Sequence, residues 1–279
     1  MAYIQEKFIS ADKKIIVVKK HHNLFAMPTK AKIRQRRLPK TNETKETQKE
    51  INERQRREKY MRLLADNFHA GDFYVTFTTA EKMTAEELKL SMKNFMKRLR
   101  REYEKRTGEK IKYFRVLENM VGRGRPHAHM LLPKFCAADE IRGLMARLWP
   151  GGHVSVQIYG GEAMDAYKVS AYFTKQDKKE HGAKIDTSRG NLIRREPKKK
   201  IIHAETFSDE IKAPAGYRVV KPLSYNTKTT AGYDYQIAVF EKIEGGQAGN
   251  EFYCSKRETK KKISGSGKPK PGTSTRKND

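Results

Sequence analysis

The sequence has few cysteines, no long hydrophobic run and no nucleotide-binding motif. Of its 279 residues only Cys136 and Cys254 are cysteine, too few for a disulfide framework, so a reducing environment is expected. The mean hydropathy is −0.86, and no apolar stretch is long enough to predict a transmembrane helix. The first residues lack the form of a secretory signal. These absences favour a cytoplasmic protein of a bacterial host, with no membrane partner and no ATPase or helicase activity of its own.

Acidic residues are also scarce relative to basic ones. Lysine and arginine total 60 against 33 aspartate and glutamate, a formal net charge of +27. A surplus this large makes the folded chain repel itself unless a polyanion is near, which indicates a nucleic-acid partner whose affinity falls with salt. Charge alone is equally typical of ribosomal, chromatin-like and membrane-surface proteins.

Hydrophobic periodicity is regular only in the centre of the chain, between residues 71 and 180. A capping box, Thr84 with Glu87, starts a helix, and the sequence predicts one further helix between strands and another after the last strand. The predicted elements are strands at 73–78, 112–118, 124–132 and 153–159 and helices at 84–107, 139–148 and 162–175. Their βαββαβ order predicts an α+β fold, a ferredoxin-like antiparallel sheet with two helices on one face and the other face open.

The flanking segments carry weaker patterns. We expect a basic, largely helical N-terminal arm over residues 1–70 that orders on DNA or a partner, although Ile15 to Val18 could form a short strand. Residues 181–262 predict a C-terminal region with a small β extension, near 217–220 and 233–240. Residues 263–279 are rich in lysine, serine, glycine and proline, which is typical of a disordered basic tail.

Two histidines on one predicted strand are the main candidate metal ligands. His127 and His129 are two residues apart, so their imidazoles lie on the same face. A metal needs at least one more ligand, and Glu118, late in the preceding strand, can reach it if the two strands form a hairpin. Two imidazoles, one carboxylate and open positions suit Mg²⁺ or Mn²⁺ acting on a phosphate substrate. The alternative is that both histidines are ordinary residues of a solvated sheet.

A tyrosine downstream is the candidate nucleophile. Tyr172 has Lys168 four residues before it and Lys175 three residues after it, which a helix places on its own face. A cation near a phenol lowers the phenol pKa and can stabilise charge on a phosphate. Tyr167 lies about 140° away around the helix and its stripe indicates core packing, which is also the commonest role of a helical tyrosine.

Further residues are candidates for DNA binding. Arg123 and Arg125 flank a glycine turn beside the histidines and could hold a phosphate, or could belong to a solvated turn. Thr76 and Thr78 either line the open face of the sheet or only favour a strand. Lys168 completes this set of candidate DNA-binding residues.

The ordered segments 114–118, 124–132 and 171–175 resemble the HUH endonucleases. The similarity is greatest to the rolling-circle replication initiators of filamentous and other single-stranded DNA phages and related plasmids. Two residues depart from the family pattern: Ala128 replaces a bulky hydrophobic residue between the histidines, and Gln176 stands where some members have a second tyrosine. The second departure implies an enzyme with a single catalytic tyrosine.

The resemblance implies a mechanism and a set of partners. Metal held by Glu118, His127 and His129 polarises a scissile phosphate in single-stranded origin DNA. Tyr172 attacks, giving a 5′-phosphotyrosine and a free 3′-hydroxyl, and Lys175 positions the phosphate. A host helicase and polymerase would then extend the 3′ end.

Two other classes of function remain open from the sequence. A relaxase or a single-strand transposase would use the same chemistry, although relaxases usually place the tyrosine before the histidines. A basic nucleic-acid-binding protein on a ferredoxin-like sheet would have no catalysis.

Overall fold

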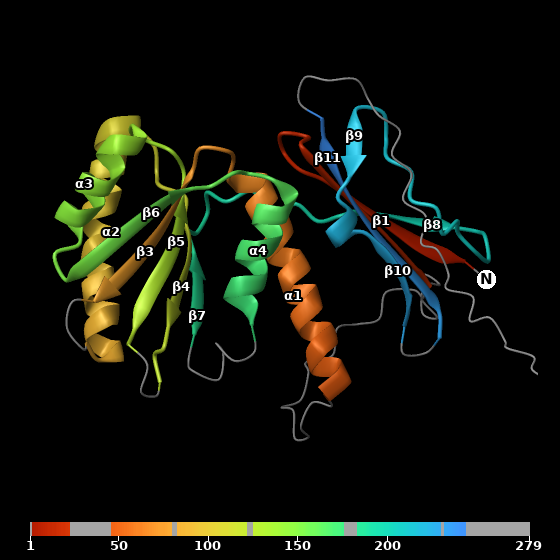
Figure 1. The fold of residues 1–279 in the computed structure, drawn as a ribbon, viewed down its shortest axis with the longest axis horizontal. Coiled ribbons are helices and arrows are strands. Elements are labelled where there is room, and N and C mark those ends of the chain that lie inside the picture. The colour runs from red at the N-terminus through yellow and green to blue at the C-terminus, as the bar shows by residue number, and fades with distance from the viewer. Residues whose placement is uncertain are drawn as a thin grey trace, which may run out of the picture.

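The protein contains two antiparallel sheets with helices packed between and outside them. The computed structural model describes residues 2–22, 46–79, 83–121, 125–175, 183–229 and 232–243. In Figure 1 one sheet carries helices α2 and α3 on its outer side, and helices α1 and α4 lie between the two sheets. Arg123, Gln176, Cys254 and the tail from 263 onward lie outside the described residues.

The first sheet confirms the predicted α+β class. Its strands follow the order β6-β3-β5-β4-β7, in which every neighbouring pair is antiparallel. The first four strands have the ferredoxin-like arrangement, and β7 adds a fifth strand that the sequence did not predict. The elements of this unit are β3 (Phe73–Thr79), α2 (Ala85–Thr107), β4 (Phe114–Glu118), β5 (His127–Leu132), α3 (Ala138–Leu148), β6 (Gly152–Ile158), α4 (Ala163–Thr174) and β7 (Lys184–Thr187).

The helices form where local signals predicted them. Thr84 caps α2, and the reciprocal contacts of the capping box with Glu87 are both present. The apolar stripe of α2 is buried, as is that of α3. The alternation of β6 predicts an inward Ile158, but this residue is 63% exposed, because β6 is the edge strand of its sheet.

The second sheet joins the two ends of the chain. Six strands take part, in the order β10-β11-β2-β1-β8, with β9 paired to β11. Its elements are β1 (Tyr3–Ile9), β2 (Ile15–His22), β8 (Lys198–Ile202), β9 (Tyr217–Val219), the short 3₁₀ helix η1 (Lys221–Leu223), β10 (Tyr225–Lys228) and β11 (Asp234–Lys242).

This sheet differs from the expectation of a largely helical N-terminal arm. Residues 3–22 form a β-hairpin, and only α1 (Glu46–Asn67) is helical among the described residues before 70. The hairpin is stabilised by strands almost two hundred residues away, β8 and β11. A local pattern cannot report such pairing, because each strand becomes stable only against its partners.

The face expected to be open is partly covered. Phe114, Val116 and Leu131 point to that face and belong to a buried cluster with residues of α1 and α4. The same cluster includes Phe8 and Val239 of the second sheet, so one apolar core joins the two sheets. Covering this part of the face removes apolar side chains from water, which an open face would leave exposed.

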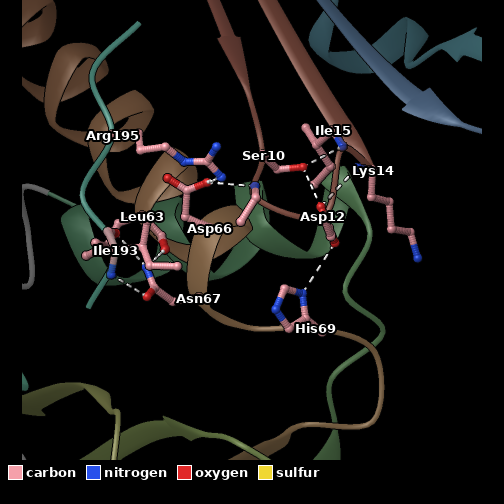
Figure 2. Close-up of polar contacts among 11 residues, drawn as sticks. Ser10, Asp12, Lys14, Ile15, Leu63, Asp66, Asn67, His69, Ile193 and Arg195 are labelled. Carbon is pink, nitrogen blue, oxygen red and sulfur yellow. Dashed lines mark hydrogen bonds and ion pairs between the residues drawn. The ribbon is translucent and has the colours of Figure 1, made fainter. Parts of the chain in front are cut away.

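Polar contacts at the end of α1 fix the junction. Figure 2 shows Asp66 and Asn67 reaching the β1–β2 turn and the segment around Ile193. Asp66 Oδ1 accepts hydrogen bonds from the Ala11 amide at 3.0 Å and from Arg195 at 2.9 Å. The Asn67 side chain pairs with both backbone groups of Ile193, at 2.8 and 2.7 Å. These contacts hold the two sheets in one orientation.

The described part of the chain contains no helix that is both long and apolar enough to cross a bilayer.

Candidate metal and tyrosine site

The β4–β5 hairpin brings the three candidate metal ligands together. Glu118 lies directly opposite His127 in the strand register, and paired residues on neighbouring strands share a face. His129 lies two residues along the same strand. One ligand atom from each of these three residues lies within 4.8 Å of the other two, so the cluster could hold a metal ion.

The cluster is sheltered from solvent on one side. Glu118 is 4% exposed and His129 is 8% exposed, whereas His127 is half-buried. The Glu118 carboxylate Oε2 lies 3.3 Å from His127 Nε2. A buried carboxylate is stable only with a partner, and here two imidazoles and a phenol surround it.

Both histidines present the same ring nitrogen to the cluster. His127 Nδ1 lies 3.0 Å from the backbone carbonyl of Arg125, and His129 Nδ1 lies 3.0 Å from the Thr76 hydroxyl. A carbonyl can only accept, so Nδ1 of His127 carries the proton and Nε2 directs its lone pair toward the cluster. An imidazole held in this way by an oxygen acceptor is the usual arrangement of a metal-binding histidine.

Helix α4 places Tyr172 directly against these ligands. The Tyr172 hydroxyl lies 3.1 Å from His129 Nε2 and donates to Glu118 Oε2 at 3.3 Å. The Tyr172 ring packs edge-on to the His129 ring, with centroids 5.1 Å apart. A phenol and three ligands from three separate elements therefore converge at one place.

Tyr167 lies elsewhere. Its hydroxyl accepts a hydrogen bond of 3.0 Å from Arg57 of α1, and its ring lies under the same guanidinium. Tyr167 therefore joins two helices, in agreement with the packing role that its stripe indicated.

The entry to α4 explains why Tyr172 reaches the site. Gly161 has a φ of +72°, and a Cβ at this position would lie 2.3 Å from the backbone nitrogen of Ala70. The loop before β3 and the end of β6 are further joined by hydrogen bonds between Gly71 and Tyr159 and between Tyr159 and Asp72. Only glycine permits both this φ and this close approach, so the start of α4 is fixed against the sheet.

The predicted DNA-binding residues lie around the cluster, with differing contacts. Thr78 is half-buried on the same face as Thr76. Arg125 is exposed and its guanidinium approaches the Thr79 carbonyl at 3.5 Å. Lys168 and Lys175 are exposed.

Lys175 does not lie on the helical face that the sequence predicted. Helix α4 ends at Thr174, and Lys175 is its C-cap with φ −51° and ψ 140°. The backbone has left the helix there, so the argument from helical spacing does not place the Lys175 side chain next to Tyr172.

Two residues near the cluster were missed in the sequence. Tyr74 stacks on His129 at 5.8 Å and 25°, and burial, with smaller effects from Tyr172 and Glu118, raises its pKa far above the usual value. Asn119 has a φ of +53° and donates to the same Arg125 carbonyl as His127, at 3.2 Å. The alternation that placed Thr76 on this face also places Tyr74 there, and asparagine is a residue type that tolerates positive φ.

Residues 72–177 match the family model of replication-associated proteins of the ORF2 and gene-2-protein type. This match supports a replication initiator-type protein. The matched segment runs from the start of β3 to just beyond α4, so it contains the metal cluster and Tyr172. No curated protein and no solved structure matches the chain. A role in replication implies that the protein binds DNA, which agrees with its net charge of +27.

Proposed function

We propose that this protein is a rolling-circle replication initiator of the HUH type, which nicks and rejoins single-stranded DNA at an origin. The observation that carries the proposal is the position of the Tyr172 hydroxyl, 3.1 Å from His129 Nε2 and 3.3 Å from Glu118 Oε2. A tyrosine that only packs in a core does not need to end among three potential metal ligands.

Glu118, His127 and His129 are the proposed metal-binding residues. Their two imidazole nitrogens and one carboxylate fit a divalent cation, and in a phosphate-processing site that cation is Mg²⁺ or Mn²⁺. When bound, the cation polarises the scissile phosphate and neutralises charge that develops on it. The Arg125 carbonyl and Thr76 keep the imidazoles turned toward the cation.

Tyr172 is the proposed nucleophile. Its oxygen forms a bond to the phosphorus, and the bond from phosphorus to the 3′ oxygen breaks. The phenol loses a proton and the leaving 3′ oxygen gains one, which gives a 5′-phosphotyrosine and a 3′-hydroxyl. The phosphodiester energy is stored in the covalent link, so the same residue can rejoin ends without ATP.

Single-stranded DNA is proposed to cross the part of the sheet that α1 and α4 leave free. Thr76 and Thr78 of β3 and Ser155 and Gln157 of β6 share this face through the strand register, and the two β6 residues are exposed. Arg125 and Lys168 would contact neighbouring phosphates, and Lys175 would position the scissile one. Charged contacts of this kind hold the strand without reading its sequence.

The partners follow from the chemistry. A nick with a free 3′-hydroxyl needs a polymerase to extend it and a helicase to unwind the duplex, and we propose that a bacterial host supplies both in its cytoplasm.

The test uses the full chain, Mn²⁺ and a labelled single-stranded oligonucleotide from the origin of the replicon that carries the gene. We expect a covalent protein–DNA band on a denaturing gel. The band should disappear with EDTA and with Tyr172→Phe, and it should persist with Tyr167→Phe, which removes the phenol on the other side of the same helix.

Two results would overturn the proposal. Retained adduct formation by Tyr172→Phe would exclude Tyr172 as the nucleophile. Failure of every origin segment to give cleavage or an adduct, with DNA binding intact, would favour a non-catalytic nucleic-acid-binding protein.

A further inference from the structure

The outer face of the six-stranded sheet carries a group of lysines that the catalytic site does not use. Lys7 lies directly opposite Lys198, and Gln5 lies opposite both Lys200 and Lys20. Residues that face each other in antiparallel strands point to the same side, and so do residues two apart along a strand. Lys7, Lys20, Lys198 and Lys200 therefore form one lysine face across β8, β1 and β2.

These lysines are close together, and no acidic residue of the same three strands lies on their side. With strands about 4.8 Å apart and residues about 3.4 Å apart along a strand, the four Cβ atoms lie within a patch of roughly 10 by 7 Å. Glu6 is the only acidic residue in these three strands. It points to the opposite face, where it lies 3.7 Å from His21 and 3.0 Å from Lys199. Like charges directly opposite each other destabilise a sheet, which indicates that the lysine face has an anionic partner.

Protection of a sheet edge does not account for the lysine face. Lysines on an edge strand prevent pairing with other chains, and β8 is an edge strand. Lys7 and Lys20, however, lie on the inner strands β1 and β2. Lys20 is also half-buried, with its ammonium group 5.6 Å from the centre of the Phe207 ring, so it has no role at the edge.

We propose that the lysine face binds the phosphate backbone of duplex DNA. The choice of DNA rests on the proposed function, since an initiator must hold the double-stranded DNA that flanks its nick. Duplex DNA carries about one negative charge per 1.7 Å of its axis, which complements a compact group of lysines.

The aromatic residues on this face argue for a duplex and against a single strand. Proteins that hold single strands stack the bases on free aromatic rings. Here the rings of Tyr3 and Phe207 pack edge to face at 5.1 Å, and His22 stacks on Phe207 at 5.8 Å. Tyr3 is only 8% exposed. The rings therefore pack against one another, and the exposed groups that remain are lysines.

The lysine face and the catalytic site can be occupied together. The other face of the same sheet contributes Phe8 and Val239 to the core shared with α1 and α4. The lysine face consequently points away from the unit that holds Tyr172, with α1 and α4 between the two (Figure 1).

The experiment compares the full-length protein with the triple variant Lys7→Gln, Lys198→Gln, Lys200→Gln, in which all three altered residues are exposed. Binding to a short labelled duplex is measured by fluorescence anisotropy over a range of salt concentrations. Each phosphate contact contributes about 0.9 to the slope of log affinity against log salt. We expect the triple variant to lower the magnitude of this slope by about 2 to 3.

Two controls match the variant. Lys199→Gln alters the neighbouring residue of the same strand, which is 66% exposed but points to the other face and pairs with Glu6; it should leave the slope nearly unchanged. The triple variant Lys93→Gln, Lys97→Gln, Arg101→Gln removes the same charge from the exposed side of α2 and should also retain the slope. A slope unaffected by the lysine-face variant, or lowered equally by the α2 variant, would overturn the inference.

Two further measurements distinguish duplex binding by the lysine face from membrane binding and from nicking. If the lysine-face variant loses binding to phosphatidylserine vesicles but keeps duplex binding, the face binds membrane and the inference is wrong. Nicking of the single-stranded oligonucleotide is expected to be retained by the variant. A wild-type protein that does not nick, yet shows a duplex-binding slope that depends on the lysine face, would refute the proposed function and leave this inference standing.

Discussion

Replacing Thr76 with valine should weaken metal binding without disturbing the fold. The Thr76 hydroxyl lies 3.0 Å from His129 Nδ1, and for His129 to bind a cation through Nε2, Nδ1 must donate its proton to that hydroxyl. Valine has nearly the same shape but cannot accept a hydrogen bond. Loss of such a supporting contact typically lowers metal affinity about 10- to 100-fold, or roughly 1.4 to 2.8 kcal/mol.

Isothermal calorimetry with Mn²⁺ measures this affinity directly, and thermal unfolding provides a second measurement. At saturating metal, a tenfold weaker affinity lowers the stabilisation by metal by about 1.4 kcal/mol. Without metal, the variant should lose only about 1 kcal/mol, the cost of one unmade hydrogen bond.

Thr78→Val is the matched control, because Thr78 lies on the same strand and face as Thr76 and faces His127 in the register. Metal affinity unchanged by Thr76→Val, or lowered equally by Thr78→Val, would refute the assignment of Thr76 as the residue that orients His129.

Three further predictions concern other parts of the molecule. Gly161→Ala should cost at least about 2 kcal/mol of unfolding free energy in urea, clearly more than Gly190→Ala, since Gly190 has a φ of +81° but open space around it. A hydrogen bond with His21 contributes most to holding the pKa of Glu6 at about 2, below its usual 4.5; this stabilisation is present above pH 4.5 and is lost as the pH falls toward 2. Glu6→Gln should therefore cost about 1 kcal/mol at pH 5 and much less near pH 2, and equal losses at both would contradict the linkage. Lys175→Gln should slow oligonucleotide cleavage roughly 10- to 100-fold with little change in single-strand affinity, and an unchanged rate would remove Lys175 from the proposed mechanism.

Much of the catalytic unit could be predicted because its signals are local. The capping box at Thr84, the apolar stripes of α2 and α3 and the two-residue spacing of His127 and His129 depend only on neighbouring residues. The hairpin that pairs Glu118 with His127 spans a short turn, so its register was also accessible. The fold class follows from the order of these elements.

Other features of the site depend on contacts between distant segments. Thr76 was expected to line a DNA-binding face, but its partner is His129, a pairing that only the strand order determines. Tyr74 stacks on His129 for the same reason. The end of α4 before Lys175 removes a helical face that the spacing had assumed.

The sequence by itself determined the helices, the central strands and the residue types that can bind a metal, because backbone periodicity and capping act over a few residues. Only the tertiary structure decided that residues 3–22 pair with strands from 198–242 and that α1 and α4 cover part of the first sheet. Both arrangements depend on apolar surfaces that are buried only when segments far apart in the chain come together, and no local pattern records which surface meets which.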